Sequence, residues 1–159
     1  MHKDADFIPL NIAILTLSDS RTFENDTSGQ TLVDSLQAAG HKLAARELCK
    51  DEIYTSRAIV SAWIADPGID VIISTGGTGL TQRDSTPEAL KPLFDQNIEG
   101  FGELFRQVSY DEIGSSTVQS RALAGLANQT LVFCLPGSTG ACLTGWNRIL
   151  KEQLDSSHR

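Results

Sequence analysis

Three strand-like segments alternate with two helical patterns through the first half of the chain. The strand-like segments span about residues 11–17, 41–48 and 71–74, and the helical patterns span about 27–39 and 52–65. The uninterrupted β-branched run at 71–73 is typical of a strand buried on both faces of a parallel sheet. Because crossovers between parallel strands are right-handed, this order predicts a β-α-β-α-β arrangement with helices covering the sheet.

The second half adds helices and a hairpin. Helices are expected at about 87–94 and 101–110, and a last helix runs to about residue 154. Two apolar runs, 121–127 and 130–135, flank an Asn-Gln turn and predict an antiparallel edge. We therefore expect an α/β fold of three α/β/α layers with a mostly parallel sheet. Residues 1–159 are expected to form a single domain, with its core at about 7–154.

Several helix boundaries carry local signals. Thr27 and Gln30 match the spacing of a capping box, in which Thr27 caps the helix and Gln30 reaches back. Gly40 is a natural carboxyl-terminal stop for the same helix. Thr86 followed by Pro87 predicts an N-cap and a first helical residue.

The loop at 75–79, Thr-Gly-Gly-Thr-Gly, is the most informative stretch of the sequence. Gly76, Gly77 and Gly79 permit positive φ angles and a close approach of backbone to a ligand. The loop follows the buried strand at 71–74, and α/β folds bind ligands at the carboxyl ends of such strands. Its spacing matches neither the Walker A motif nor the dinucleotide fingerprint. The loop predicts a site for a phosphate-bearing ligand, with a purely structural turn as the alternative.

Two aspartates are expected near this loop. Asp84 lies five residues after the loop, next to Arg83, and Asp51 follows the second strand, so both are expected at one edge of the sheet. Paired carboxylates beside bound phosphates suit Mg²⁺, which keeps water and phosphate oxygens among its ligands. The alternatives are structural: Asp51 would cap a helix, and Asp84 would be a solvated turn residue.

Two further loops belong to the same predicted edge. Ser18 and Asp19 follow the first strand. Asp19 and the nearby Asp26 are weaker candidates for the metal, and turn formation is the favoured interpretation of both. The segment 136–140, Pro-Gly-Ser-Thr-Gly, opens the last helix and presents backbone N–H groups that attract anions. Its alternative is an ordinary helix start with Ser138 as the cap.

Composition limits the classes of function. A net charge of −7 and a pI near 4.8 argue against binding to nucleic acid or to anionic membranes. Three cysteines without a Cys-x-x-Cys pair argue against a zinc site and against a disulfide framework. Since no apolar run approaches 18 residues, no membrane span is expected, and the predicted location is the cytoplasm.

These motifs together resemble the MoaB/MogA family of molybdenum cofactor biosynthesis proteins. The resemblance covers about residues 7–154. It is carried by the segment at 11–21, the glycine loop at 75–79, Glu-Gly-Phe-Gly-Glu-Leu-Phe-Arg at 99–106 and Leu-Pro-Gly-Ser-Thr-Gly-Ala-Cys at 135–142. The glycine loop and the Leu-Pro-Gly-Ser turn, in this order, form a highly specific pair.

The resemblance implies a molybdopterin-binding fold and, in active members, molybdopterin adenylyltransferase activity. Such enzymes use ATP and Mg²⁺ to transfer AMP to the terminal phosphate of molybdopterin, and they release pyrophosphate. By motif match the catalytic and magnesium-binding aspartates are Asp51 and Asp84, although the first match could slip to Glu52. The implied ligand-binding residues are Ser18, Asp19, Thr75, Gly76, Gly77, Thr78, Gly79, Pro136, Gly137 and Ser138.

The family also implies partners and an alternative function. Its members form homo-oligomers, trimers or hexamers, and other cofactor biosynthesis proteins are possible partners. Some MoaB-type paralogues are not active, so the alternative is a non-catalytic carrier or scaffold that binds molybdopterin. A NAD-binding domain is disfavoured because its glycine fingerprint is missing.

Overall fold

A six-stranded sheet forms the centre of the protein in the computed structural model, which describes residues 6–158. Its strands are β1 (Asn11–Leu17), β2 (Lys42–Cys49), β3 (Val71–Thr75), β4 (Gln96–Asn97), β5 (Leu123–Ala127) and β6 (Thr130–Leu135). They lie in the order β2-β1-β3-β6-β5-β4, and the first four are parallel. At the other edge, β5 pairs antiparallel with β6, and β4 pairs antiparallel with β5. The expected sheet is confirmed, and the two-residue strand β4 was not predicted.

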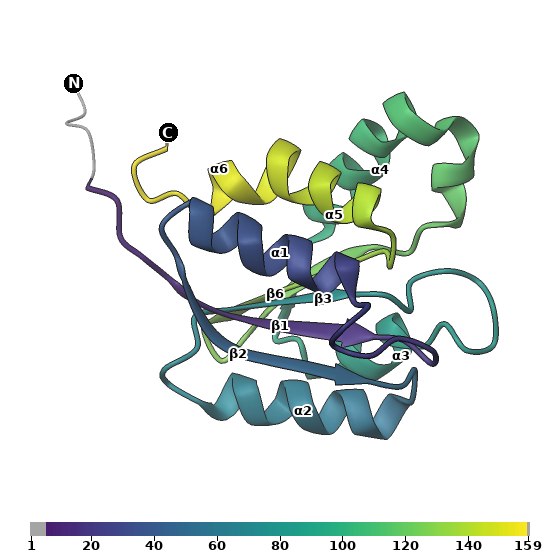
Figure 1. Ribbon diagram of the computed structural model, residues 1–159, viewed down its shortest axis with the longest axis horizontal. Coiled ribbons are helices and arrows are strands. Elements are labelled where there is room, and N and C mark those ends of the chain that lie inside the picture. The colour runs from purple at the N-terminus through teal and green to yellow at the C-terminus, as the bar shows by residue number, and fades with distance from the viewer. Residues whose placement is uncertain (1–5, 159) are drawn as a thin grey trace.

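Helices cover both faces of the sheet (Figure 1). They are α1 (Thr27–Ala38), α2 (Ile53–Ala65), α3 (Thr86–Leu90), α4 (Glu99–Ile113), α5 (Thr139–Gly145) and α6 (Lys151–Gln153). α2 and α3 lie on one face, and the other four lie on the opposite face. Short 3₁₀ segments follow α3 and α4, and a π-helical turn at Trp146–Leu150 joins α5 to α6. No helix within residues 6–158 is long and apolar enough to span a membrane.

The central strands divide their side chains between two cores. In β1, Ile12 and Ile14 pack with the apolar residues of α1, α4 and α5. Ala13 and Leu15 point the other way and pack with Val60 of α2 and its neighbours. Because successive residues of a strand face opposite sides, a strand covered on both faces must be apolar throughout. This packing explains the uninterrupted apolar runs in the sequence.

The start of α1 differs from the expected capping box. Asp26, rather than Thr27, is the N-cap, and its carboxylate accepts a hydrogen bond from the Gly29 N–H at 3.0 Å. Asp26 is buried and also accepts hydrogen bonds from Thr16 Oγ1 and Arg46 Nη2. A carboxylate held by neighbouring strands is the stronger acceptor at a helix amino terminus, so the boundary moves back by one residue.

The start of α3 also moves by one residue. Ser85 is the N-cap, and Thr86 is the first helical residue. Thr86 Oγ1 donates instead to the Gly76 carbonyl at 2.9 Å. The hydroxyl that was predicted to cap a helix therefore anchors the glycine loop.

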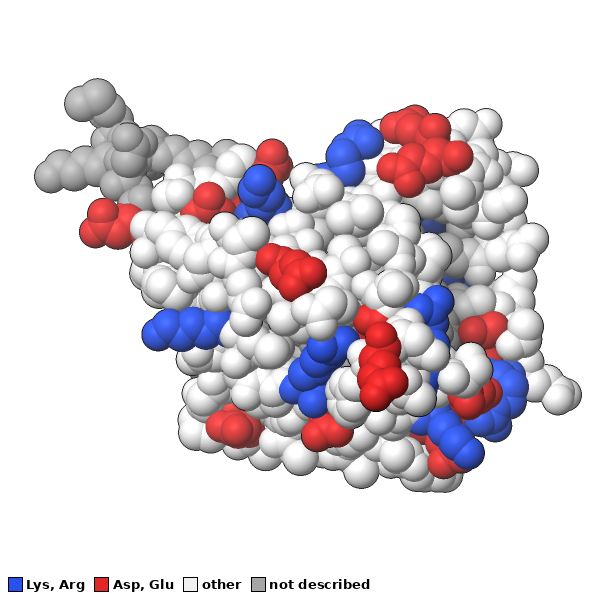
Figure 2. All heavy atoms as spheres, in the orientation of Figure 1, with Lys and Arg blue, Asp and Glu red and all other residues white. Residues whose placement is uncertain are grey.

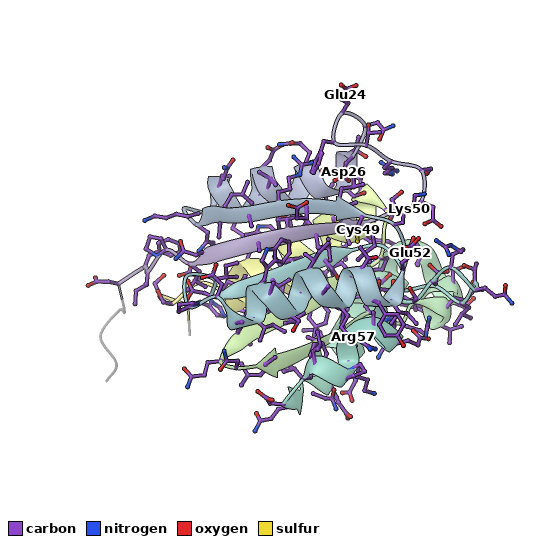
Figure 3. All side chains as sticks on the ribbon, turned by 90° about the horizontal axis from the view of Figure 1, so that it is seen from below. Glu24, Asp26, Cys49, Lys50, Glu52 and Arg57 are labelled. Atoms are coloured by element: carbon purple, nitrogen blue, oxygen red, sulfur yellow. The ribbon has the colours of Figure 1, made fainter. Side chains whose placement is uncertain are left out.

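The parallel strands deliver their loops to one end of the molecule. In Figure 1 the loops after β1, β2, β3 and β6 lie at the right, away from the two termini. The labelled side chains of Cys49, Lys50 and Glu52 lie at this end in the perpendicular view of Figure 3, and Asp26 lies there at the start of α1. The fold thus assembles the site from loops that are distant in sequence.

Candidate active site

A cleft of about 570 Å³ opens at the carboxyl ends of the parallel strands. It is hollowed between the loops that follow these strands and the wall formed by α4 and its 3₁₀ extension. All twelve residues expected at the site line it: Ser18, Asp19, Asp51, Thr75, Gly76, Gly77, Thr78, Gly79, Asp84, Pro136, Gly137 and Ser138. The structure brings these residues together, and their individual roles stay predictions.

Two glycines of the loop adopt backbone angles that disfavour other residues. Gly76 has φ +107° and Gly77 has φ +74°. A Cβ on Gly76 would lie 2.2 Å from the Leu17 carbonyl oxygen, and one on Gly77 would lie 2.6 Å from Asp51 Oδ1. Gly79 lacks a positive φ, but a Cβ there would lie 2.7 Å from an Asp84 carboxylate oxygen. The loop is therefore packed directly against both candidate aspartates.

The second predicted ligand loop touches the first. Thr75 Oγ1 donates to the Pro136 carbonyl at 2.8 Å, and a Cβ on Gly137 would lie 3.3 Å from the Cα of Gly76. Ser138 caps α5 by accepting from the Ala141 N–H at 3.1 Å. The structural interpretation of Ser138 is thus correct, and its position in the cleft is compatible with ligand contact as well.

Asp51 is held in an electrostatically unfavourable place. It does not cap α2, because Glu52 occupies the N-cap position. Its Oδ1 atom is buried and accepts no hydrogen bond from the described residues. Burial, followed by repulsion from Asp19 and Asp84, raises the pKa of the Asp51 carboxyl to about 6. A buried carboxylate oxygen without a partner is suited to a cation.

Glu52, the other possible match, points elsewhere. Its side chain accepts a hydrogen bond from Thr55 Oγ1 at 3.3 Å, and it does not line the cleft. The geometry therefore favours Asp51 at this position of the motif.

Asp84 is firmly anchored beside the loop. Its Oδ2 atom accepts hydrogen bonds from Thr81 N at 3.0 Å and from Thr81 Oγ1 at 2.8 Å. Arg121 donates to the carbonyls of Asp84 and Gly79. These contacts match the turn interpretation of Asp84, and they also fix the carboxylate at the edge of the cleft.

The charges around the cleft are mostly negative. Of the described residues that line it, five are acidic (Asp19, Asp26, Asp51, Asp84 and Glu112), and Arg21 alone is basic. Arg83 and Arg121 lie near the cleft, but they are engaged by Asp19 and by the glycine loop. At the lower right of Figure 2, acidic and basic side chains gather at this end of the molecule. A phosphate ligand would therefore need a further positive charge.

The far wall of the cleft was not predicted. It includes Phe105, Ser109, Glu112 and Ile113 of α4, Ser116, Gln119 and Ser120 beyond it, and Thr144 of α5. The helix predicted to end at about residue 110 extends to Ile113. The spacing of Ser109, Glu112 and Ser116 follows one helical face and is a signal that could have extended the prediction.

Comparison with known proteins adds to this geometry. Residues 13–156 match the family described as "Probable molybdopterin binding domain". The chain belongs to this family. It is 56% identical over 154 residues to molybdenum cofactor biosynthesis protein B of Escherichia coli (strain K12), covering 97% of this chain and 91% of that protein. The resemblance inferred from the sequence motifs is confirmed.

Solved structures of family members superpose closely. A crystal structure of molybdenum cofactor biosynthesis protein B has a TM-score of 0.89, with 43% identity over 92% of each chain. The tungsten cofactor synthesizing protein MoaB from Pyrococcus furiosus has a TM-score of 0.82, with 35% identity over 91% of this chain and 92% of that one. These members of the family share the fold described here.

The cleft of this family member has donors that fit Mg²⁺. Among the described residues no group of three His, Cys, Asp or Glu side chains is placed to enclose a metal ion. Asp51 and Asp84 offer carboxylate oxygens, and Asp51 Oδ1 has no hydrogen-bond partner within residues 6–158. Magnesium commonly takes one or two carboxylates and completes its shell with water and substrate phosphates. The two aspartates therefore fit an ion that takes its remaining ligands from water and from phosphate oxygens.

The unfavourable environment of Asp51 leads to a stability prediction. Its raised pKa of about 6 means that the ionised carboxylate costs folding free energy above that pH. The cost disappears as the pH falls towards 4, where the folded protein has taken up the proton. After allowance for its partial exposure, we expect Asp51→Asn to stabilise the fold by about 1 kcal/mol at pH 7.5, or about 2–4 °C in Tm.

Thermal denaturation at pH 7.5 and at pH 4.5 checks this prediction. The difference in Tm between Asp51→Asn and wild type should be positive at the higher pH and should fall to about a third of that value at the lower one, because the cost decreases between the folded and unfolded pKa values. The adjacent Glu52→Gln variant is the control, since Glu52 lies outside the cleft. A lower Tm for Asp51→Asn at pH 7.5 would contradict the prediction.

Proposed function

We propose that this protein adenylylates molybdopterin in molybdenum cofactor biosynthesis. In the proposed reaction it binds molybdopterin and ATP with Mg²⁺ in the cleft, transfers AMP to the terminal phosphate and releases pyrophosphate. Family membership and the names of the relatives support the pathway. The observation that carries the reaction is the glycine loop, which packs against two carboxylates at the strand ends.

The reaction depends more on aligning the two phosphates than on activating a nucleophile. A terminal phosphate oxygen of molybdopterin attacks the α-phosphorus of ATP, and a new P–O bond forms. The bond between the α-phosphorus and the bridging oxygen breaks, and its electron pair leaves with pyrophosphate. Because the acceptor is already an anion, no serine or cysteine nucleophile is needed, and the protein must instead hold two repelling phosphates in line.

The chain offers separate groups for these tasks. The backbone N–H groups of 76–79 would hold nucleotide phosphate, because glycines allow a close approach there. The 136–138 loop would contact the pterin or its phosphate, and Arg21 would add positive charge. Asp51 and Asp84 would hold Mg²⁺, which neutralises phosphate charge when bound. Such a cation offsets the acidic excess of the cleft.

Pyrophosphate release tests the proposal directly. Purified protein, molybdopterin and ATP with Mg²⁺ should yield one pyrophosphate and one adenylylated molybdopterin per turnover. Omission of either substrate should abolish release. Molybdopterin binding without pyrophosphate would contradict the proposal and would indicate the alternative, a non-catalytic carrier or scaffold.

Removal of the metal gives a second expected result. Chelation with excess EDTA should lower pyrophosphate release by at least about 100-fold, because the charges of the phosphates and carboxylates then repel each other unscreened. Added Mg²⁺ should restore it. Full activity in EDTA would contradict a role for a divalent cation. Assembly into trimers or hexamers stays a separate prediction, which sedimentation velocity can measure.

A further inference from the structure

One carboxylate joins three of the loops at the cleft. Asp19, in the loop after β1, accepts a hydrogen bond from the backbone N–H of Asp51 at 3.1 Å. Its two oxygens also accept from Arg83, at 2.8 Å from Nε and 2.9 Å from Nη2. Asp51 follows β2, and Arg83 follows β3. The loops of three adjacent parallel strands therefore meet at the carboxylate of Asp19.

The residues tied in this way are the immediate supports of the candidate metal ligands. Asp19 holds the backbone of Asp51, and Arg83 is the covalent neighbour of Asp84. Asp84 is already fixed from its other side by Thr81 and Arg121. Asp51 has no comparable anchor on its own side chain, since its Oδ1 atom is buried and has no partner in the part of the chain that the structure describes. The contacts with Asp19 thus link a well-anchored aspartate to a poorly anchored one.

We propose that the Asp19–Arg83 ion pair is a positioning device that sets Asp51 and Asp84 in register for a divalent cation. This inference rests on the proposed function. Asp19 would then act through Asp51 rather than contact the ligand, because both of its oxygens are already engaged. Arg83 also neutralises Asp19, which leaves Asp51 and Asp84 as the carboxylates available to the metal.

Stability does not account for this ion pair. The side chains of Arg83 and Asp19 are 57% and 39% exposed, and pairs at this exposure contribute little to folding. What distinguishes the pair is its geometry. A planar guanidinium that binds two carboxylate oxygens fixes the orientation of both groups, which a lysine would not do. The effect of the pair is therefore expected in the site rather than in the fold.

A matched pair elsewhere supplies the control. Arg148 and Asp111 also form an Arg–Asp ion pair with both side chains at least half exposed, at 3.9 Å. Neither residue lines the cleft. Arg148→Gln therefore removes the same kind of charge without touching the three loops.

The first measurement does not depend on activity. Mn²⁺ alone is titrated into wild type, Arg83→Gln, Asp19→Ala, the double variant and Arg148→Gln, with detection by electron paramagnetic resonance. We expect Arg83→Gln to weaken Mn²⁺ binding by about 10-fold, as measured for groups that orient metal ligands in other proteins. Electrostatics alone predicts the opposite, because loss of a cation should tighten Mn²⁺ binding. Unchanged or tighter binding in Arg83→Gln would overturn the proposal.

Two further measurements separate positioning from folding and from turnover. Hydrogen exchange of the Asp51 amide should become at least about 5-fold faster in Asp19→Ala and in Arg83→Gln, but not in Arg148→Gln. The Tm of each variant should stay within about 2 °C of wild type, since exposed pairs contribute little. An unchanged Asp51 exchange rate in Asp19→Ala and Arg83→Gln, or a large fall in Tm, would overturn the positioning role.

If the wild-type protein releases pyrophosphate, steady-state kinetics of the variants provide a further measurement. Asp19→Ala and Arg83→Gln should each lower kcat about 10-fold with KM for ATP unchanged, whereas Arg148→Gln should leave both unchanged. The double variant should be no worse than either of the first two, as for groups that act as a unit. Additive losses in kcat would overturn the proposal. If wild type releases no pyrophosphate, the proposed function fails, while the Mn²⁺ and exchange measurements still decide the positioning role.

Discussion

Asp84→Asn is expected to lower pyrophosphate release by at least about 100-fold while molybdopterin binding stays within about threefold of wild type. Asparagine has nearly the same shape, and its amide oxygen can keep the hydrogen bonds that Asp84 Oδ2 accepts from Thr81. The backbone carbonyl of Asp84 remains bound to Arg121. The substitution therefore removes a negative charge from the cleft and leaves the loop in place.

The control is an aspartate outside the cleft whose carboxylate also accepts a backbone hydrogen bond within a turn. Asp66 Oδ1 accepts a hydrogen bond from Gly68 N at 2.8 Å in a turn outside the cleft. Asp66→Asn should therefore leave pyrophosphate release unchanged. Initial rates at saturating substrates, together with equilibrium binding of molybdopterin, measure the two quantities separately. Loss of molybdopterin binding in Asp84→Asn, or retention of its activity, would contradict a metal-binding role for Asp84.

Gly76→Ala is expected to cost about 3 kcal/mol or more of unfolding free energy and to abolish ligand binding. Its φ of +107° is strained for any residue with a side chain. The added Cβ would lie 2.2 Å from the Leu17 carbonyl oxygen, which belongs to the backbone at the end of β1. Since a backbone atom cannot rotate away, either the loop or the strand must shift.

Urea denaturation measures this effect, and a second glycine provides the comparison. Gly100 lies in α4, and a Cβ there would meet nothing within 4 Å. Gly100→Ala should be neutral or stabilising, because alanine is the better helix former by about 1 kcal/mol. A loss below about 1 kcal/mol for Gly76→Ala would mean that the loop adapts easily, contrary to a rigid ligand cradle.

The local chemistry of the site could be predicted because it depends on short segments. The residue type permits positive φ at Gly76, Gly77 and Gly79, and the first two adopt it. The meeting of Asp51 and Asp84 followed from topology, since parallel strands deliver their carboxyl ends to one edge. The hydrogen-bond partners of the side chains could not be predicted in this way. Asp51 was expected, as the alternative, to cap a helix, but Glu52 is the N-cap and Asp51 Oδ1 has no partner among the described residues.

The sequence by itself determined the five longer strands and where the backbone must bend, because periodicity and glycine act within a few residues, whereas the two-residue strand β4 carries no such pattern. Tertiary structure decided which acidic side chain or carbonyl each arginine binds. Arg83 pairs with Asp19 across 64 positions of the chain, and Arg121 binds the Asp84 carbonyl across 37. Such contacts depend on how loops from different strands pack, so no local pattern encodes them. They leave Arg21 as the only basic side chain among the described residues of an otherwise acidic cleft.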